Sequence, residues 1–193
     1  MNSGNRQSGR HGGFTLFELI VVISIISVLF VFAANRLMKL AVQAERAQVQ
    51  QTIGTLKSAL AMEIAAHVAR DTIPELEKWI GANPMDLLAD PPKSYLGALD
   101  HPDPAGIEGG HWYFDRRQGL LVYRVYNERE FVTSLPGPKR IRWRLEPVYE
   151  DRNGNRRFDP GQDALVGLRL AAQEKFKWQV EPVDIPAWKA NPR

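Results

Sequence analysis

The sequence predicts an α+β protein in which a long N-terminal helix packs on a small antiparallel β-sheet head. Two observations lead to this prediction. Residues 14–70 repeat apolar side chains at helical spacing, and residues 111–180 hold short runs rich in aromatic and β-branched residues. The length of 193 residues suits one modest globular domain with an additional element rather than two full domains.

We expect six consecutive segments along the chain. They are a leader (1–13), a membrane-spanning helix (14–34), an amphipathic continuation of that helix (35–70), short helices and a loop (71–110), the β head (111–180) and an extended tail (181–193).

The overall composition excludes several classes of function. Two of the 25 Lys and Arg residues, Arg6 and Arg10, lie in the leader, so the rest of the chain is nearly neutral against 22 Asp and Glu, which gives no case for nucleic-acid binding. The sequence contains no cysteine, which excludes a disulfide framework, a thiolate zinc site and a cysteine nucleophile. It also lacks a nucleophile motif, paired catalytic acids and a phosphate-binding loop, so we expect no enzymatic activity.

The first residues have the pattern of a membrane anchor. A polar, basic leader without acids precedes the apolar run 14–34, in which Glu18 is the single charged residue. At about 1.5 Å per residue this run forms a helix of roughly 31 Å, the thickness of the hydrocarbon core of a bilayer. Arg6 and Arg10 precede the run, which favours a cytoplasmic N-terminus and an external head. A plain signal-anchor helix would have the same features.

Glu18 is the unusual residue in this run. An ionisable group near the centre of a membrane costs about 2.5–3.5 kcal/mol and is a functional candidate by default. A simpler interpretation is that Glu18, four residues after Phe14, lies at the level of the lipid headgroups, where the helix dipole favours an anion.

Residues 13–22, GFTLFELIVV, resemble the prepilin processing signature shared by type IV pilins and type II secretion pseudopilins. The resemblance implies that a prepilin peptidase cuts between Gly13 and Phe14 and methylates the new amine of Phe14. It also implies that the Glu18 carboxylate pairs with the terminal amine of a neighbouring subunit, which sets the axial register of assembly. Family members commonly carry a proline late in the apolar run, where this chain has Asn35, so the helix melting that such a proline favours is not implied here.

By this resemblance the chain is a non-enzymatic structural subunit that assembles through its N-terminal helix into a pilus. Its implied partners are the prepilin peptidase, other pilin or pseudopilin subunits and an inner-membrane assembly platform. Before assembly it would cross the inner membrane once, with a cytoplasmic N-terminus and a periplasmic head. Three alternatives stay open: a type II secretion pseudopilin, a minor pilin whose head binds DNA or a surface, and a simple signal-anchored periplasmic protein.

Beyond Asn35 the helical pattern continues and becomes amphipathic. An apolar stripe at three- and four-residue steps is expected to lie under the head, with Glu45 among the polar residues of the other faces. We expect His67 on a solvated face near the end of the helix, which should stop close to Asp71. Gly54 is a weak point that costs about 1 kcal/mol relative to alanine.

The rest of the chain predicts short helices followed by strands. The sequence after Thr72 has capping-box spacing, and Asn83 precedes a proline at the first turn of another short helix. Aromatic and β-branched residues then predict four or five antiparallel strands, at residues 112–114, 120–126, 140–149, 165–170 and 176–180.

A loop in the head is a candidate calcium site. Oxygen side chains lie at offsets one, three, five and nine of an EF-hand-like loop: Asp151, Asn153, Asn155 and Asp159. The match is incomplete, because Gly154 takes the fourth place rather than the sixth and Gln162 stands where a bidentate glutamate belongs. Asp163 is one residue further and could replace it. The alternative is an Asn-Gly hairpin turn with solvated acids and no metal.

Residues 138–145, PKRIRWRL, alternate strictly between basic and apolar positions. Arg140, Arg142 and Arg144 therefore share one strand face. Such a ridge could bind DNA phosphates, form salt bridges between subunits, or solvate one side of an amphipathic strand. The four histidines have no metal-ligand spacing.

Overall fold

The structure, a computed structural model, describes residues 15–179. The leader, Phe14 and the tail from residue 180 lie outside the described residues. The long helix α1 (Leu16–Ala69) is continuous. The chain divides into two compact units at the boundary between Ala41 and Val42, and each unit is described by itself.

In the first unit, residues 16–41 are helical and their apolar side chains are exposed. The uninterrupted helix agrees with the absence of proline from this part of the sequence, because proline is the commonest cause of a sharp kink. Gly54, further along α1, does not interrupt the helix either.

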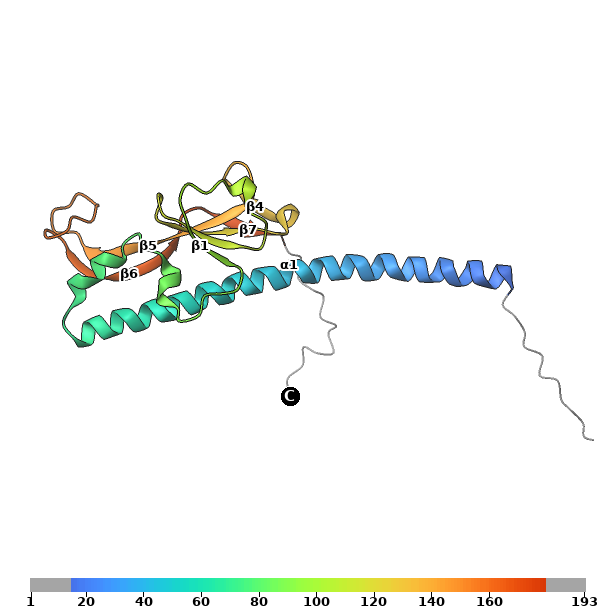
Figure 1. Ribbon diagram of the computed structural model, residues 1–193, viewed down its shortest axis with the longest axis horizontal. Coiled ribbons are helices and arrows are strands. Elements are labelled where there is room, and N and C mark those ends of the chain that lie inside the picture. Colours follow the sequence, from blue (N-terminus) through green and yellow to red (C-terminus); the bar gives the residue numbers. More distant parts are fainter. Residues whose placement is uncertain (1–14, 180–193) are drawn as a thin grey trace, which may run out of the picture. The chain divides into compact units, whose positions relative to one another are not determined.

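In the second unit, the remainder of α1 lies along one face of a five-stranded sheet (Figure 1). The sheet has the order β1-β2-β3-β5-β6, formed by Tyr95–Leu99, Trp112–Asp115, Leu120–Arg124, Arg140–Glu150 and Ala164–Ala172. A second sheet pairs β4 (Phe131–Thr133) with β7 (Phe176–Trp178). Short 3₁₀ helices connect these elements: η1 (Ile73–Trp79), η2 (Pro84–Leu87), η3 (Pro104–Gly106) and η4 (Glu128–Glu130).

The α+β class and the long helix on a mostly antiparallel sheet are confirmed. Sequence analysis missed β1, which pairs with β2 in parallel inside the segment where we expected only short helices and loop. The five residues of β1 include Gly97, at φ +94°, and the pairing is irregular there. A short edge strand with a central glycine and prolines on both sides has little strand signal.

The main core lies between α1 and the sheet. Val42, Val49, Leu56 and Leu60 of α1 are buried with the inner residues of the strands. On β5 these inner residues are Ile141, Trp143 and Leu145, all at most 4% exposed. A second, smaller cluster covers the opposite face of the sheet and contains Tyr113, Leu120 and Val122, with Leu99 and Ile107 packed against it. The sheet therefore has apolar packing on both faces, and Ile107 attaches the loop between β1 and β2 to the face opposite α1.

Alanine substitutions at two glycines should change the free energy of unfolding in opposite directions. Gly119 has φ +64°, and a Cβ there would lie 2.8 Å from the carbonyl oxygen of Gly81. Gly119→Ala should therefore lower the free energy of unfolding by more than the ~1–2 kcal/mol of a left-handed residue. Gly54 is helical with nothing within 4 Å, so Gly54→Ala should raise it by about 1 kcal/mol.

Urea unfolding of the detergent-solubilised chain, followed by tryptophan fluorescence, measures both effects. No tryptophan precedes Trp79, so the signal reports on the head. A Gly119→Ala midpoint equal to wild type would show that Gly119 and Gly81 are not in close contact.

Candidate functional site

The first turn of α1 is capped by Thr15. The backbone N–H of Glu18 donates to Thr15 Oγ1 at 3.2 Å, and the N–H of Leu19 donates to the Thr15 carbonyl oxygen at 3.1 Å. Threonine is a favoured N-cap because its hydroxyl accepts one of the unpaired N–H groups of the first turn. Glu18 lies in that turn and is exposed, where the helix dipole also favours its charge. Gly13 and Phe14, the predicted processing residues, lie outside the described residues.

The N-terminal part of α1 exposes an apolar surface. Leu16 is 78% exposed, Phe17 is 75% exposed, and Phe30 and Phe32 are both 71% exposed. The hydroxyls of Ser24 and Ser27 donate to carbonyl oxygens one turn earlier, at 2.8 and 2.7 Å, so they need no partner from solvent. Among the described residues, α1 is the one helix that is long and apolar enough to cross a membrane.

Glu45 ties α1 to the chain that follows β3. Its side chain is buried, and Oε1 accepts from the Tyr123 hydroxyl at 2.9 Å and from the Tyr126 N–H at 2.7 Å. Oε2 accepts from the Asn127 N–H at 3.0 Å and from Asn127 Nδ2 at 2.6 Å. Four donors on one carboxylate satisfy a buried charge well.

This arrangement corrects the expectation that Glu45 lies on a solvated face. Glu45 comes three residues after Val42 and four before Val49, both of them buried, so its spacing places it on the inward stripe. Burial, together with the nearby Glu45 carboxylate, raises the pKa of the Tyr123 hydroxyl far above its usual value. Tyr123 therefore stays protonated and remains a donor to Glu45.

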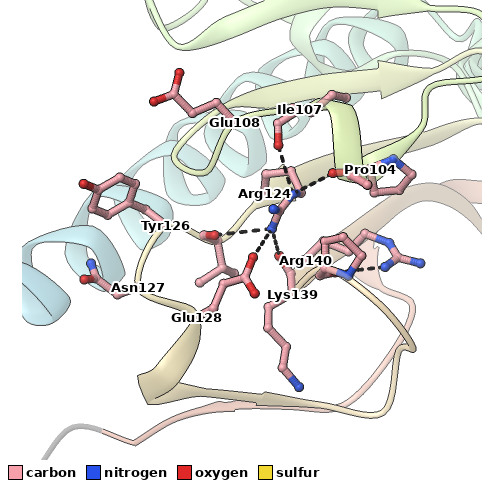
Figure 2. Close-up of polar contacts among 12 residues, drawn as sticks. Pro104, Ile107, Glu108, Arg124, Tyr126, Asn127, Glu128, Lys139 and Arg140 are labelled. Carbon is pink, nitrogen blue, oxygen red and sulfur yellow. Dashed lines mark hydrogen bonds and ion pairs between the residues drawn. The ribbon is translucent and has the colours of Figure 1, made fainter.

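Arg124 holds the same turn from another direction (Figure 2). Its Nε donates to the carbonyl oxygens of Pro104 at 2.9 Å and Ile107 at 3.2 Å. Its Nη1 donates to the Lys139 carbonyl oxygen at 2.8 Å and to Glu128 Oε1 at 2.7 Å. The side chain is 9% exposed, so one buried guanidinium joins three loops. No sequence pattern predicted this role.

His67 is also buried, which corrects its predicted place on a solvated face. Its Nδ1 lies 2.8 Å from Thr72 Oγ1 and 3.0 Å from the Thr72 carbonyl oxygen. Its Nε2 lies 3.4 Å from Glu63, which also accepts from Trp79 Nε1. The packing of η1 against the end of α1 covers this face of the helix, which the sequence of α1 alone does not reveal.

The residues of the candidate calcium loop form the long connection between β5 and β6. Asp151 accepts from the N–H groups of Gly154 at 2.7 Å and Arg156 at 2.8 Å. Asp163 uses both oxygens in the same way, at 3.0 Å from the Arg152 N–H and 2.8 Å from the Asp159 N–H. Both acids thus stabilise the loop by binding its own backbone.

The two asparagines surround Asp159. The Nδ2 atoms of Asn153 and Asn155 donate to Asp159 Oδ2 at 2.7 and 2.5 Å, and their Oδ1 atoms accept backbone N–H groups of the loop. These bonds lower the pKa of the Asp159 carboxyl. Within residues 15–179, no three His, Asp or Glu side chains form a group that could hold a metal.

We therefore expect the loop to stay ordered when metal is removed. EDTA should leave the protease resistance of residues 151–163 unchanged, because hydrogen bonds already satisfy the acids. Calcium binding stays a prediction of the sequence. A rise in the urea midpoint on adding Ca²⁺, absent from the Asp159→Asn variant, would establish it.

The arginines of β5 alternate with buried residues as predicted, but two of them are engaged within the head. Arg142 Nε lies 3.1 Å from Glu174 Oε2 in an ion pair. Arg140 Nη1 donates to the carbonyl oxygens of Pro136 and Pro138, both at 3.0 Å. Arg144 is exposed. The ridge is thus largely bound to its own head, which does not favour a role in binding DNA phosphates.

Comparison with known protein families adds one finding at the N-terminus. Residues 8–34 match the family model of the prokaryotic N-terminal methylation motif. The chain carries the type IV pilin and pseudopilin signature. No curated protein and no solved structure matches the chain.

The motif includes Gly13, Phe14 and Glu18, together with the capped first turn and much of the exposed apolar helix. It implies processing by a prepilin peptidase and assembly with other pilin subunits. Such a motif is typical of structural subunits rather than of enzymes. The motif does not reach the head, so the roles of Glu45 and Arg124 come from the structure.

Proposed function

We propose that this chain is a type IV pilin-like structural subunit. It is cut between Gly13 and Phe14, methylated at Phe14, and assembled through its N-terminal helix into a pilus. The observation that carries the proposal is the coincidence of the methylation motif with a helix whose apolar side chains are exposed. A helix with this surface needs either lipid or other helices around it.

Glu18 makes the membrane-inserted state of this helix less favourable than the assembled state. A carboxylate in an apolar environment is costly unless it is paired. The Phe14 amine of a neighbouring subunit is a suitable partner, because processing creates it at the start of the same helix. We infer that the subunit first crosses the inner membrane with its head in the periplasm, and that pairing then favours the filament.

A type II secretion pseudopilin is the close alternative, since both classes share the motif. The two differ in the filament that they build: a pilus extends from the cell, whereas a pseudopilus stays in the envelope. The head's charges do not favour a third candidate, a DNA-binding minor pilin, because Arg140 and Arg142 are already bound.

Shearing appendages from cells and analysing the filament fraction by mass spectrometry tests the proposal. A pilus subunit should be abundant there, with an N-terminal peptide that begins at methylated Phe14. A processed chain found in the envelope fraction instead would assign it to a pseudopilus or a priming complex. A chain that still begins at Met1 would overturn processing and assembly together.

A further inference from the structure

The turn after β3 fixes the backbone of an exposed tyrosine, Tyr126. Glu45 accepts the Tyr126 N–H at 2.7 Å from the side of α1. Gly109 packs against the same backbone so closely that a Cβ on it would lie 2.7 Å from Tyr126 Cα. Gly110 is adjacent, and its Cβ would lie 4.0 Å from Tyr126 Cβ. Two separate contacts, one from α1 and one from the loop at Gly109, thus hold the backbone of Tyr126.

Arg124 binds the residue before Tyr126 and the second residue after it. Its Nη1 donates to the Val125 carbonyl oxygen at 3.4 Å and to Glu128 Oε1 at 2.7 Å. Two largely buried charged residues, Glu45 and Arg124, therefore position a turn of only a few residues. Breaking hydrogen bonds to buried charges is costly, so the turn should be rigid.

None of these contacts involves the aromatic ring of Tyr126. The residue is 68% exposed, and Figure 2 shows its ring pointing away from Arg124. Among residues 15–179, no other ring stacks on it and no group binds its hydroxyl. An exposed tyrosine by itself is ordinary. Here a fixed backbone presents a free ring, which is how a pre-organised interface anchor is built.

The exposed surface of α1 indicates the partner. Its N-terminal part is the exposed apolar run that we propose as the polymerisation element. Beyond Glu45, α1 also exposes Met62 at 73% and Val68 at 55%. A second copy of α1 therefore offers apolar surface that suits a tyrosine ring, and tyrosine is enriched among the residues that dominate binding energy.

We propose that Tyr126 is an anchor residue between subunits, packing on α1 of a neighbouring copy of this chain in the filament. The inference rests on the proposed function, because it requires that the chain assembles. It assigns the head a contact of its own in a filament otherwise held by N-terminal helices.

Site-specific photo-crosslinking in cells tests the contact. The photoreactive residue p-benzoylphenylalanine replaces Tyr126 in the full chain, and the sheared filament fraction is irradiated. We expect a crosslinked dimer of this chain, with the crosslink in a peptide of α1, and we expect its loss in the Glu18→Ala background. The matched control places the same residue at Val166, a position on β6 that is 50% exposed.

Substitution gives a second readout. Tyr126→Ala should reduce the yield of sheared filament about tenfold, as for an interface residue of high importance, whereas Tyr126→Phe should stay near wild type. The urea midpoint of Tyr126→Ala should equal that of wild type, because the ring is exposed and its backbone contacts remain.

The outcomes separate a failure of the anchor inference from a failure of the proposed function. If the chain is in filaments but position 126 crosslinks no more than position 166, or crosslinks a different protein, the anchor inference is overturned and the proposed function stands. If the wild-type chain is missing from filaments and from the envelope-assembled fraction, both are overturned. Equal filament yields for Tyr126→Ala and wild type would also overturn the anchor.

Discussion

Alanine in place of Glu18 is expected to leave the chain processed and folded but to remove it from filaments. The carboxylate lies in the first turn of an exposed apolar helix, four residues from the predicted new N-terminus at Phe14. An unpaired acid at the membrane centre costs about 2.5–3.5 kcal/mol, and this figure is an upper bound for Glu18, which lies in the first turn of the helix. Pairing with an amine removes that cost only in the assembled state, so the substitution removes the preference for assembly.

The measurement is the amount of chain in the sheared fraction relative to the membrane fraction, with processing followed by the gel shift that accompanies leader removal. Glu75→Ala, at an exposed glutamate of η1, is the matched control and should assemble normally. If Glu18→Ala reached wild-type amounts in filaments, Glu18 would have no role in assembly, and its charge would only interact favourably with the helix dipole. The Thr15 cap remains in the variant, so helix loss would not explain a defect.

The elements that sequence analysis predicted well are those whose signal is local. The apolar run, the helical stripe and the alternation along β5 each contain their own periodicity, and the structure places them as expected. Short helices η1 and η2 start after Thr72 and Asn83 as predicted, but the Asn83 side chain caps its helix whereas the Thr72 side chain makes no cap hydrogen bond. At these places local preference and packing agree.

The elements that were missed depend on partners distant in the sequence. Glu45 is buried because Tyr123, Tyr126 and Asn127 supply donors from about 80 residues away, and a polar residue on an apolar stripe is otherwise assigned to solvent. The strand β1 forms because β2 offers it an edge. Periodicity contains no information on such pairings, so the candidate site of the head could not be predicted.

The candidate calcium loop is a different case, because its sequence is compatible with two kinds of partner for the acids. Spacing alone placed oxygen atoms at suitable intervals, yet each acid can bind either a cation or the loop's own N–H groups. In the structure they bind the N–H groups and the asparagine amides. Sequence spacing predicts which residues share the loop, whereas the side-chain orientations decide what they bind.

Glu45→Ala should destabilise the head far more than substitutions at exposed positions of the same helix. The change leaves the Tyr123 hydroxyl, the Tyr126 N–H and both Asn127 donors without their acceptor. A buried donor without a partner costs about 1–3 kcal/mol, and water can reach the half-buried Asn127, so we expect a total loss of about 3 kcal/mol. Glu45→Gln should fall between alanine and wild type, because the amide oxygen still accepts while its NH₂ opposes the remaining donors.

The urea midpoint of the full chain in detergent, followed by tryptophan fluorescence, measures this loss. Gln48→Ala, three residues along the same helix and exposed, is the matched control and should change the free energy of unfolding by less than about 0.5 kcal/mol. Equal midpoints for Glu45→Ala and Gln48→Ala would show that the carboxylate does not bind the turn. If it does bind the turn, Glu45→Ala should also weaken the crosslink at position 126, because the tyrosine then loses the hydrogen bond that fixes its backbone on the side of α1.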